Sequence, residues 1–331
     1  MIVVTGGAGF IGSNLIATLE AYAPTARRLE LVVCDRWGSG DKWRNIAKHE
    51  ISDWVPPERL FDFLNSNTKK IDAIFHMGAI SSTVETDVDL IAETNFSISL
   101  RLWEWCTKNK VRLIYASSAA TYGDGAAGFD DDNDPRVLAQ LQPLNPYGWS
   151  KHTFDRRVIR LAAAGIKPPQ WVGLKFFNVY GPNEYHKEGQ RSVVVQMYQQ
   201  IQREGRIRLF KSHREGIADG DQRRDFVWVG DCAAVMMWLY DNPKISGIFN
   251  LGTGQARSFA DLALAVFSAM GRPAEIDYIP MPEAIRRHYQ YFTEARMERL
   301  RKAGYKKPFA SIEDGVRSYV RTYLATEDPF L

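Results

Sequence analysis

The sequence predicts an α/β protein with a doubly wound parallel sheet and a smaller interleaved α/β lobe. Short apolar, β-branched segments alternate strictly with helical patterns from residue 2 to residue 177. A glycine-rich turn follows the first apolar segment at once, and no linker or low-complexity stretch interrupts the alternation. Strands that alternate with helices in this way favour parallel βαβ units over separate helical and sheet domains.

The composition excludes several functional classes. The 331 residues are 45% hydrophobic and 24% charged, and the formal net charge of +3 is too small to indicate a nucleic-acid partner. No apolar run approaches the roughly 18 residues that span a bilayer, and no basic or cleavable segment follows Met1. The three cysteines lie far apart, which predicts neither zinc nor a disulfide. We expect a cytoplasmic protein without membrane, nucleic-acid or metal binding.

The first strand, Ile2–Thr5, leads directly into a glycine turn and then a helical pattern. The spacing is G-x-x-G-x-x-G, formed by Gly6, Gly9 and Gly12, with Phe10 and Ile11 inside it. Such glycines allow a tight turn and bring the backbone close to a pyrophosphate at the helix N-terminus. A plain glycine-rich turn is the alternative. The position directly behind a strand favours dinucleotide binding, which we predict for this Rossmann-type unit.

A second strand, residues 29–33, ends next to Asp35 and Arg36. An acidic residue at this position binds the adenosine ribose hydroxyls of a dinucleotide, whereas an adjacent Arg can meet a 2′-phosphate. Lys42 adds a second phosphate ligand and favours NADP, with NAD left open. The alternative for Arg36 and Lys42 is that both are solvated loop charges.

The third strand, residues 71–76, ends in a loop of small residues that we expect to lie against the nucleotide. Loops after the carboxyl ends of parallel strands line the ligand crevice. His76 is interpreted as a packing group at the strand end. The helical pattern of residues 88–106 carries one internal polar residue, Asn95, and a buried amide needs partners that the cofactor loop could supply. The predicted cofactor-binding residues of this region are Met77, Gly78, Ala79, Ile80, Ser81 and Asn95.

Hydroxyl groups follow the fourth strand, residues 111–115, at Ser117 and Ser118. The next helical segment carries Tyr147 and Lys151, which share one face because they are four residues apart. A cation next to a tyrosine stabilises the phenolate, so the pair can act as a general base near neutrality. By itself this spacing also fits a surface helix with a Tyr stacked on a Lys stem.

The pattern changes after the fifth strand, residues 171–177. Residues 1–177 plus about 226–252 are predicted to form the dinucleotide-binding domain, and about 178–225 plus 253–331 the substrate lobe. Basic loops between residues 211 and 224 suit a diphosphate-bearing substrate, although a simple charged surface also explains them. Three adjacent acidic residues, Asp130–Asp132, are interpreted as solvated loop carboxylates.

The motifs together are more specific than any one of them. Four segments resemble the extended short-chain dehydrogenase/reductase family, which includes nucleotide-sugar epimerases and dehydratases: Thr5–Gly12, Tyr115–Gly123, Tyr147 with Lys151, and Phe177–Pro182. Other segments are similar to the ADP-heptose 6-epimerase branch of that family: His76–Thr83, His186-Lys187, Arg224–Val227, Tyr289–Thr293 and Ala303–Phe309. This resemblance implies epimerisation at C6 of an ADP-heptose through a 6-keto sugar, which supplies heptose for the lipopolysaccharide core. It also implies one NADP per subunit and a homo-oligomer, a pentamer.

The resemblance assigns roles to individual residues. Tyr147 is a proton-transferring acid/base, Lys151 tunes its pKa and holds the nicotinamide ribose, and Ser118 hydrogen-bonds the reacting oxygen. Lys187 is a second acid/base on the other side of the sugar, or alternatively a phosphate clamp in a loop. A lysine base requires desolvation to lower its pKa. Val179 and Lys187 join the residues that contact the cofactor.

The implied substrate contacts lie mostly in the second half of the chain: Ser82, Asn178, Gly189, Gln196, Phe210, Lys211, Ser212, His213, Arg224 and Tyr289. The sequence departs from the family pattern at three places. Gly189-Gln190 stands where a Gly-Ser pair is frequent, Gln196 where some members carry His, and Asp35-Arg36 where some have Asp-Asn. These departures put a serine contact and the Gln196 contact in doubt.

Two other functions fit the same fold. A 4-epimerase or 4,6-dehydratase on a UDP- or dTDP-sugar is one, but a dehydratase needs an Asp-Glu pair where this chain has Ala119-Ala120. A non-catalytic nucleotide-binding sensor is the other, and such proteins tend to lose the Tyr or the Lys that this chain keeps.

Overall fold

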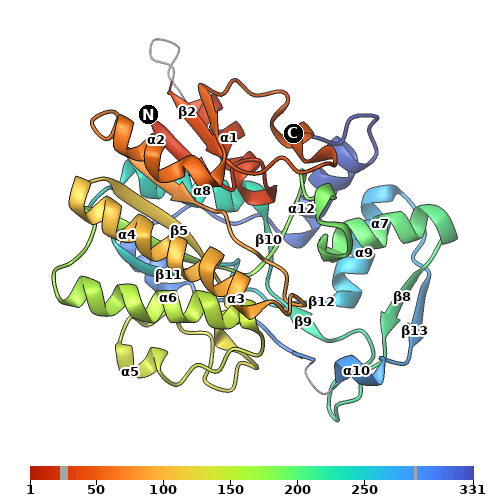
Figure 1. Cartoon of the computed structure of the whole chain (residues 1–331). Helices are drawn as coiled ribbons and strands as arrows, with labels where there is room; N and C mark the ends of the chain where they lie inside the picture. Colours follow the sequence, from red (N-terminus) through yellow and green to blue (C-terminus); the bar gives the residue numbers. More distant parts are fainter. Residues whose placement is uncertain (23–28, 287–288) are drawn as a thin grey trace.

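A computed structural model describes residues 1–22, 29–286 and 289–331 (Figure 1). Its centre is a seven-stranded parallel sheet in the order β11-β6-β5-β4-β1-β2-β3. The strands are β1 (Ile2–Thr5), β2 (Leu31–Cys34), β3 (Asp53–Val55), β4 (Ala73–His76), β5 (Arg112–Ser118), β6 (Trp171–Phe176) and β11 (Gly247–Leu251). The predicted doubly wound α/β fold is confirmed. The short strand β3 had not been predicted.

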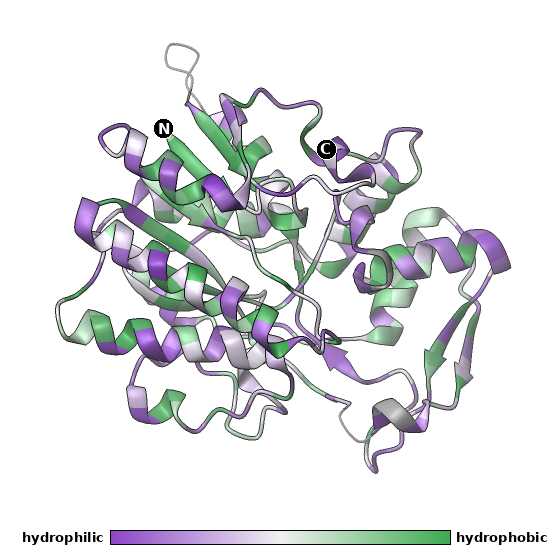
Figure 2. Cartoon of the chain, viewed as in Figure 1, coloured by the Kyte–Doolittle hydropathy of each residue, from purple (hydrophilic) through white to green (hydrophobic). Residues whose placement is uncertain are grey.

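Helices cover both faces of this sheet. Helices α1 (Phe10–Tyr22) and α8 (Val229–Asp241) pack together on one face, and α4 (Ile98–Asn109) and α6 (Pro146–Ala163) pack on the other (Figure 1). Most residues of these strands are therefore apolar, as Figure 2 shows, and β1, β2 and β4 are buried at every residue. Parallel strands that are buried on both faces produce such continuous apolar runs.

The order of the sheet reverses between β1 and β4, and this reversal creates a crevice. Strand β1 pairs with β2 on one side and with β4 on the other, with Thr5 opposite both Cys34 and His76. The three loops that follow these strands therefore leave the sheet at the same level. Gly6, Asp35 and Met77 emerge side by side at its carboxyl edge.

The helical pattern of residues 88–106 is not one regular α-helix. It consists of α3 (Val88–Ile91), a π-helical turn (Ala92–Ser97) and α4. Within this wider turn the Asn95 carbonyl accepts a hydrogen bond from Ser99 Oγ (2.6 Å). Single π-turns inside helices often occur at functional sites. The single long helix predicted from periodicity is therefore corrected to a helix with a π-turn around Asn95.

A second apolar cluster lies beside the sheet, on the right in Figure 1, and is formed mainly by α7 (Val193–Glu204), α9 (Phe259–Met270) and α12 (Ile312–Tyr319). Residues 295–305 instead pack with the sheet cluster, and α11 (Glu298–Ala303) contacts β11. The two-domain boundaries stay a prediction. The elements of this part are β7 (Asn178–Tyr180), α7 (Val193–Glu204), β8 (Ile207–Phe210), β9 (Arg223–Arg224), β10 (Phe226–Trp228), β12 (Arg257–Ser258), α9 (Phe259–Met270), β13 (Ile276–Ile279), α10 (Glu283–Arg286), α11 (Glu298–Ala303) and α12 (Ile312–Tyr319). The remaining short helices are α2 (Leu60–Asn67) and α5 (Pro135–Leu138).

Candidate active site

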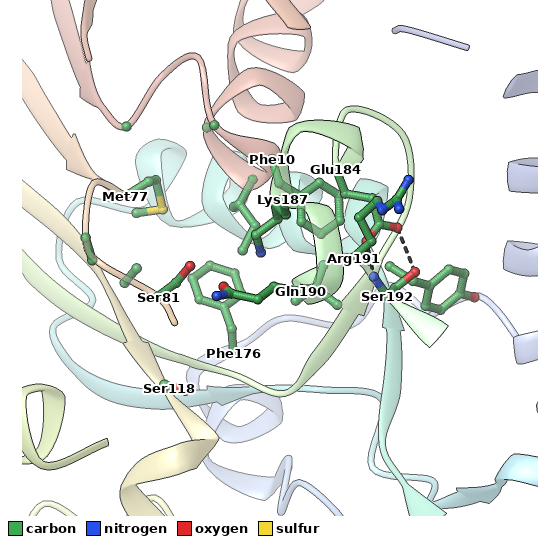
Figure 3. Close-up of a pocket in the computed structure, with 18 of the residues that line it drawn as sticks. Phe10, Met77, Ser81, Ser118, Phe176, Glu184, Lys187, Gln190, Arg191 and Ser192 are labelled. Atoms are coloured by element: carbon green, nitrogen blue, oxygen red, sulfur yellow. Dashed lines mark hydrogen bonds between the residues drawn. The ribbon is translucent and has the colours of Figure 1, made fainter. Parts of the chain in front are cut away.

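A cavity of about 460 Å³ opens at the carboxyl edge of the sheet (Figure 3). The glycine turn, the loops after β4 and β5, the start of α6 and residues 176–194 all contribute to its wall. Many of the residues predicted from sequence meet here: Gly6, Gly9, Phe10, Ile11, Gly12, Asp35, Lys42, Met77, Gly78, Ala79, Ser81, Ser118, Tyr147, Lys151, Asn178, Val179 and Lys187.

The glycine turn has the shape of a dinucleotide-binding loop. Gly6 has φ +66°, and a Cβ there would lie 2.6 Å from the Gly78 Cα. A Cβ on Gly12 would overlap the Gly6 carbonyl oxygen. Larger side chains at these positions would separate β1, β4 and α1. The N-terminus of the 13-residue helix α1 thus lies open to an anion, which fits a bound pyrophosphate.

Asp35 is buried at the end of β2 and anchors the glycine turn. Its Oδ2 accepts a hydrogen bond from the Ala8 N–H (3.0 Å), and its Oδ1 accepts one from Lys42 Nζ (2.5 Å). Lys42 also donates to the Arg36 carbonyl (2.9 Å). The Arg36 side chain turns outward and pairs with Glu58 at the exposed surface. Asp35 and Lys42 therefore fit the ribose end of a dinucleotide, and Arg36 lies at its margin.

Asn95 fixes the loop that follows β4. Its Oδ1 accepts from the Ile80 N–H and its Nδ2 donates to the Ile80 carbonyl, both at 2.9 Å, and Nδ2 lies 3.1 Å from Ser150 Oγ. The amide thereby joins the loop to α6. Ile80 and Asn95 lie behind the cavity wall, while Ala79 and Ser81 on either side of Ile80 form part of that wall.

His76, at the end of β4, has partners for both ring nitrogens. Nδ1 lies 2.6 Å from Thr5 Oγ1 and Nε2 lies 2.8 Å from Ser99 Oγ. Burial and the nearby Lys151 charge lower the pKa of His76 to about 3. A neutral, doubly bonded imidazole that crosslinks β1, β4 and α4 agrees with its interpretation as a packing group.

Helix α6 presents Tyr147 and Lys151 to the cavity. The helix starts at Asn145, whose side chain accepts from the Gly148 N–H (2.8 Å), and Pro146 occupies its first turn. Lys151 Nζ donates to the Ala116 carbonyl (2.8 Å), and burial lowers its pKa to about 8. Burial raises the pKa of Tyr147, while a hydrogen bond with Ser118 opposes this shift. The Tyr147 phenol is therefore protonated at neutral pH in this structure.

Lys187 enters the cavity from the 3-10 turn Tyr185–Gln190, and Figure 3 shows Lys187 and Gln190 projecting into it. The Lys187 Nζ lies 5.4 Å from the centre of the Phe10 ring. Burial lowers the pKa of Lys187, and the charge of Glu184 opposes this effect. Lys187 thus has the desolvated surroundings that a lysine acid/base requires.

Glu184 was missed by the sequence analysis although it lines the cavity and is buried. Its carboxylate accepts hydrogen bonds from the Ser192 hydroxyl (2.7 Å) and the Ser192 N–H (Figure 3). It also accepts one from the Tyr319 hydroxyl (3.0 Å). These bonds hold the turn that carries Lys187 against α7 and α12. A single acidic residue in a loop usually indicates solvent exposure, so no pattern in the sequence could have identified it.

Other cavity residues also went unpredicted. The apolar walls come from Phe176, Phe177, Tyr180 and Phe226. Such aromatic side chains are typical of ordinary strand cores, so they carry no functional signal in the sequence. The sequence assigns no role to His186, which precedes Lys187. The Nδ1 atom of His186 lies 3.1 Å from Asn45 Nδ2. Ser117, whose hydroxyl the sequence placed beside Ser118, also lines the cavity, and the remaining unpredicted lining residues are Ala116, Gln190, Arg191, Ser192, Val193 and Val194.

The substrate residues implied by resemblance divide into two groups. Asn178 lines the cavity, but within the described ranges the others do not: Ser82, Gly189, Gln196, Phe210, Lys211, Ser212, His213, Arg224 and Tyr289. The Arg224 guanidinium is stacked 5.3 Å from the Tyr289 ring centre and 5.7 Å from that of Phe259. Tyr289 lines a separate cavity of about 440 Å³ with Arg214 and Tyr291. The roles of these residues stay predictions.

The comparisons with known proteins agree with this geometry. The model of the NAD dependent epimerase/dehydratase family matches residues 2–252. The chain belongs to this family. It therefore uses a nicotinamide dinucleotide, and the glycine turn with Asp35 fits that group.

Individual relatives narrow the resemblance to one kind of epimerase within this family. The chain is 44% identical to the ADP-L-glycero-D-manno-heptose-6-epimerase of Fusobacterium nucleatum and 47% identical to that of Nitratidesulfovibrio vulgaris, each over 100% of both chains. A crystal structure of the Helicobacter pylori ADP-L-glycero-D-manno-heptose-6-epimerase matches with a TM-score of 0.77 and 29% identity, over 97% of this chain and 95% of the other. The predicted resemblance to the heptose 6-epimerase branch is confirmed.

Across residues 1–22, 29–286 and 289–331, no helix combines the length and apolar character of a bilayer-crossing segment. Within the same ranges, no three His, Cys, Asp or Glu side chains are grouped as metal ligands.

Proposed function

We propose that the protein interconverts ADP-D-glycero-D-manno-heptose and ADP-L-glycero-D-manno-heptose as an isomerase acting at C6. The observation that carries this proposal is the presence of two desolvated acid/base side chains, Tyr147 and Lys187, in one cavity beside a dinucleotide-binding turn. A simple dehydrogenase needs one such group. Epimerisation needs proton transfer for both orientations of the C6 oxygen, and two groups on separate elements supply it. The names of full-length relatives support the substrate.

The cofactor would be held by the glycine turn, by Asp35 and Lys42 at the adenosine end, and by Lys151 at the nicotinamide ribose. When bound, its nicotinamide supplies reversible hydride transfer. We propose that the cofactor is NADP rather than NAD. The Lys42 ammonium lies at the Asp35 carboxylate, where it could pair with the 2′-phosphate that only NADP carries.

In its phenolate form, Tyr147 accepts the proton of the C6 hydroxyl of one epimer as that carbon is oxidised, and it returns the proton in the reverse direction. Its phenol loses a proton readily only while Lys151 is an ammonium, because the adjacent positive charge stabilises the phenolate. Ser118, the hydrogen-bond partner of Tyr147, holds the same oxygen. Positioned acid/base groups of this kind contribute about 10²–10⁴ in rate.

Lys187 performs the equivalent transfer when the C6 oxygen points the other way. Its place in the same cavity as Tyr147, on a turn next to Phe10 and separate from α6, supports this role. The alternative is that Lys187 clamps a phosphate group of the cofactor or substrate. Outside this cavity, Arg224 and the basic residues near Lys211 would contact the substrate diphosphate.

Two measurements test the proposal together. Mass spectrometry of the nucleotide that co-purifies with the protein is expected to identify NADP. Purified protein is expected to convert an ADP-D-glycero-heptose to its 6-epimer, as followed by NMR. Turnover of a UDP-sugar without turnover of the ADP-heptose would replace this function by a 4-epimerase activity.

We also propose that the protein works in the cytoplasm and forms a homo-oligomer. The family resemblance implies that this oligomer is a pentamer. Light scattering coupled to size-exclusion chromatography is expected to give five times the 37.6 kDa chain mass. A monomer at micromolar concentration would contradict this.

A further inference from the structure

Behind the cavity, a fully buried ion pair joins helix α6 to strand β6. Asp155 Oδ2 lies 3.0 Å from Lys175 Nζ, and neither side chain is exposed to solvent. A buried pair loses the hydration of two charges and often adds no stability over apolar side chains. Asp155 follows Lys151 by four residues, so both project from the same face of α6. The position of this pair, directly behind the proposed acid/base group, suggests a role beyond packing.

Strand β5 connects the Asp155 carboxylate to Lys151. The Tyr115 hydroxyl donates to Asp155 Oδ1 (3.0 Å), and the Ser117 hydroxyl donates to Oδ2 (2.6 Å). Between these two residues, the Ala116 carbonyl accepts from Lys151 Nζ (2.8 Å). Three successive residues of β5 are therefore held by two side chains of α6, immediately before Ser118.

The Lys175 ammonium fixes the other side of Ser118. It donates to Thr121 Oγ1 (2.6 Å) and lies 4.8 Å from the centre of the Tyr122 ring. The Thr121 hydroxyl in turn donates to the Ser118 carbonyl (2.8 Å). The ion pair thus holds the backbone both before and after Ser118.

Several titratable groups face this pair. Burial lowers the pKa of His152 to about 4, so its imidazole is neutral near pH 7. The Asp155 charge raises the pKa of Lys151, against the effect of burial. The titratable side chains that interact with Asp155 are Tyr147, Lys151 and His152 from α6, Tyr115 from β5 and Tyr122 from the turn after β5. One step further out, Arg156 acts on His152, and Asp131 from the loop before α5 acts on Tyr122.

We propose that Asp155 is a positioning residue that supplies the negative charge facing Lys151 and orients Ser118, with Lys175 as the counter-ion of its buried carboxylate. This inference rests on the proposed roles of Tyr147 and Lys151. The two charges of the pair act on Lys151 with opposite signs, and Asp155 acts more strongly because it lies on the same helix face.

The test is a direct titration of Lys151 by NMR in full-length protein labelled with ε-¹³C-lysine. The resonance is assigned with Lys151→Arg. Asp155→Asn keeps the shape and one of the two acceptor oxygens but removes the charge, so the Lys151 midpoint is expected to fall by about one pH unit. Lys175→Met leaves the buried carboxylate without its counter-ion, so the midpoint is expected to fall in this variant too, by a smaller amount. Tyr115→Phe removes one hydrogen bond to Asp155 without a charge change and is expected to leave the midpoint in place.

Thermal unfolding identifies any variant that does not fold. The double variant Asp155→Asn/Lys175→Met leaves no unpaired buried charge, so Lys151 can still be titrated in it if Asp155→Asn does not fold. Its Lys151 midpoint is expected to fall by less than in Asp155→Asn. In the same variants the alkaline limb of kcat/KM is expected to move with the Lys151 midpoint. An unchanged midpoint in Asp155→Asn, or in the double variant if Asp155→Asn does not fold, overturns the inference. Absence of ADP-heptose turnover in the parent protein would contradict the proposed function, whereas the titration needs no turnover.

Discussion

The two acid/base groups of the cavity are held in different ways. Tyr147 and Lys151 project from an 18-residue helix that packs on the central sheet. Lys187 projects from a six-residue 3-10 turn, which depends on side-chain contacts from distant parts of the chain. Glu184 ties that turn to Ser192 and Tyr319, and Asn45 reaches His186.

This difference separates a rigid half of the site from an adjustable one. A helix and a sheet position their side chains through many backbone hydrogen bonds, so one lost contact moves them little. A short turn has few internal bonds, so its geometry follows the few side chains that anchor it. We infer that changes on the Tyr147 side alter chemistry, whereas changes near Lys187 alter chemistry and local stability together.

The largest effect is expected for Tyr147→Phe. Removing the phenolic hydroxyl leaves no proton acceptor on α6, so kcat for ADP-heptose epimerisation should fall about 10³-fold. The nucleotide absorbance of the purified protein should be retained. Tyr278→Phe, at a half-exposed position on β13, is the matched control and should keep full activity. Near-normal turnover in Tyr147→Phe would remove this residue from the mechanism.

Lys187→Met should lower kcat about 10²-fold, because one of the two orientations of the C6 oxygen loses its proton donor. Steady-state kinetics distinguishes this role from a phosphate clamp. A rise in KM with unchanged kcat would assign Lys187 to binding alone. Lys167→Met, at an exposed position after α6, is the control for loss of a lysine charge.

Glu184→Gln should destabilise the protein by about 1–3 kcal/mol, since an amide cannot accept all the hydrogen bonds of this buried carboxylate. Urea unfolding measures the change. Ser192→Ala removes one of the donors and should cost less. We also expect a lower kcat in Glu184→Gln, because the Lys187 turn loses its anchor. Unchanged stability with reduced activity would show that the anchor acts on chemistry alone.

The smallest effect is a pH dependence from the rigid half of the site. The pKa of Lys151 is about 8, so its ammonium form is present below that pH and is lost as pH rises through it. If Tyr147 depends on this charge, log kcat/KM should decline above about pH 8 at up to one unit per pH unit. Lys151→Arg should keep its charge and shift this limb to higher pH. A flat profile to pH 10 would contradict the dependence.

The first half of the chain was easier to interpret than the second. Glycines, a carboxylate and hydroxyls stand directly after apolar strands, and parallel pairing brings all strand ends to one edge. Strand periodicity and helix spacing therefore located Gly6–Gly12, Asp35, Ser118, Tyr147 and Lys151 at one cavity. In the second half, strands are short and irregularly connected. Sequence alone could not show that Arg224 stacks on Tyr289 outside this cavity.

Local sequence by itself determined the doubly wound fold, the dinucleotide turn and the Tyr147–Lys151 helix face, because each depends on residues close together in the chain. Tertiary structure decided what surrounds them. The burial of Lys187, the anchoring of its turn by Glu184 and the Asp155–Lys175 pair join residues far apart in sequence. Such contacts arise only when helices and strands pack, and they set the charges on which the proposed chemistry depends.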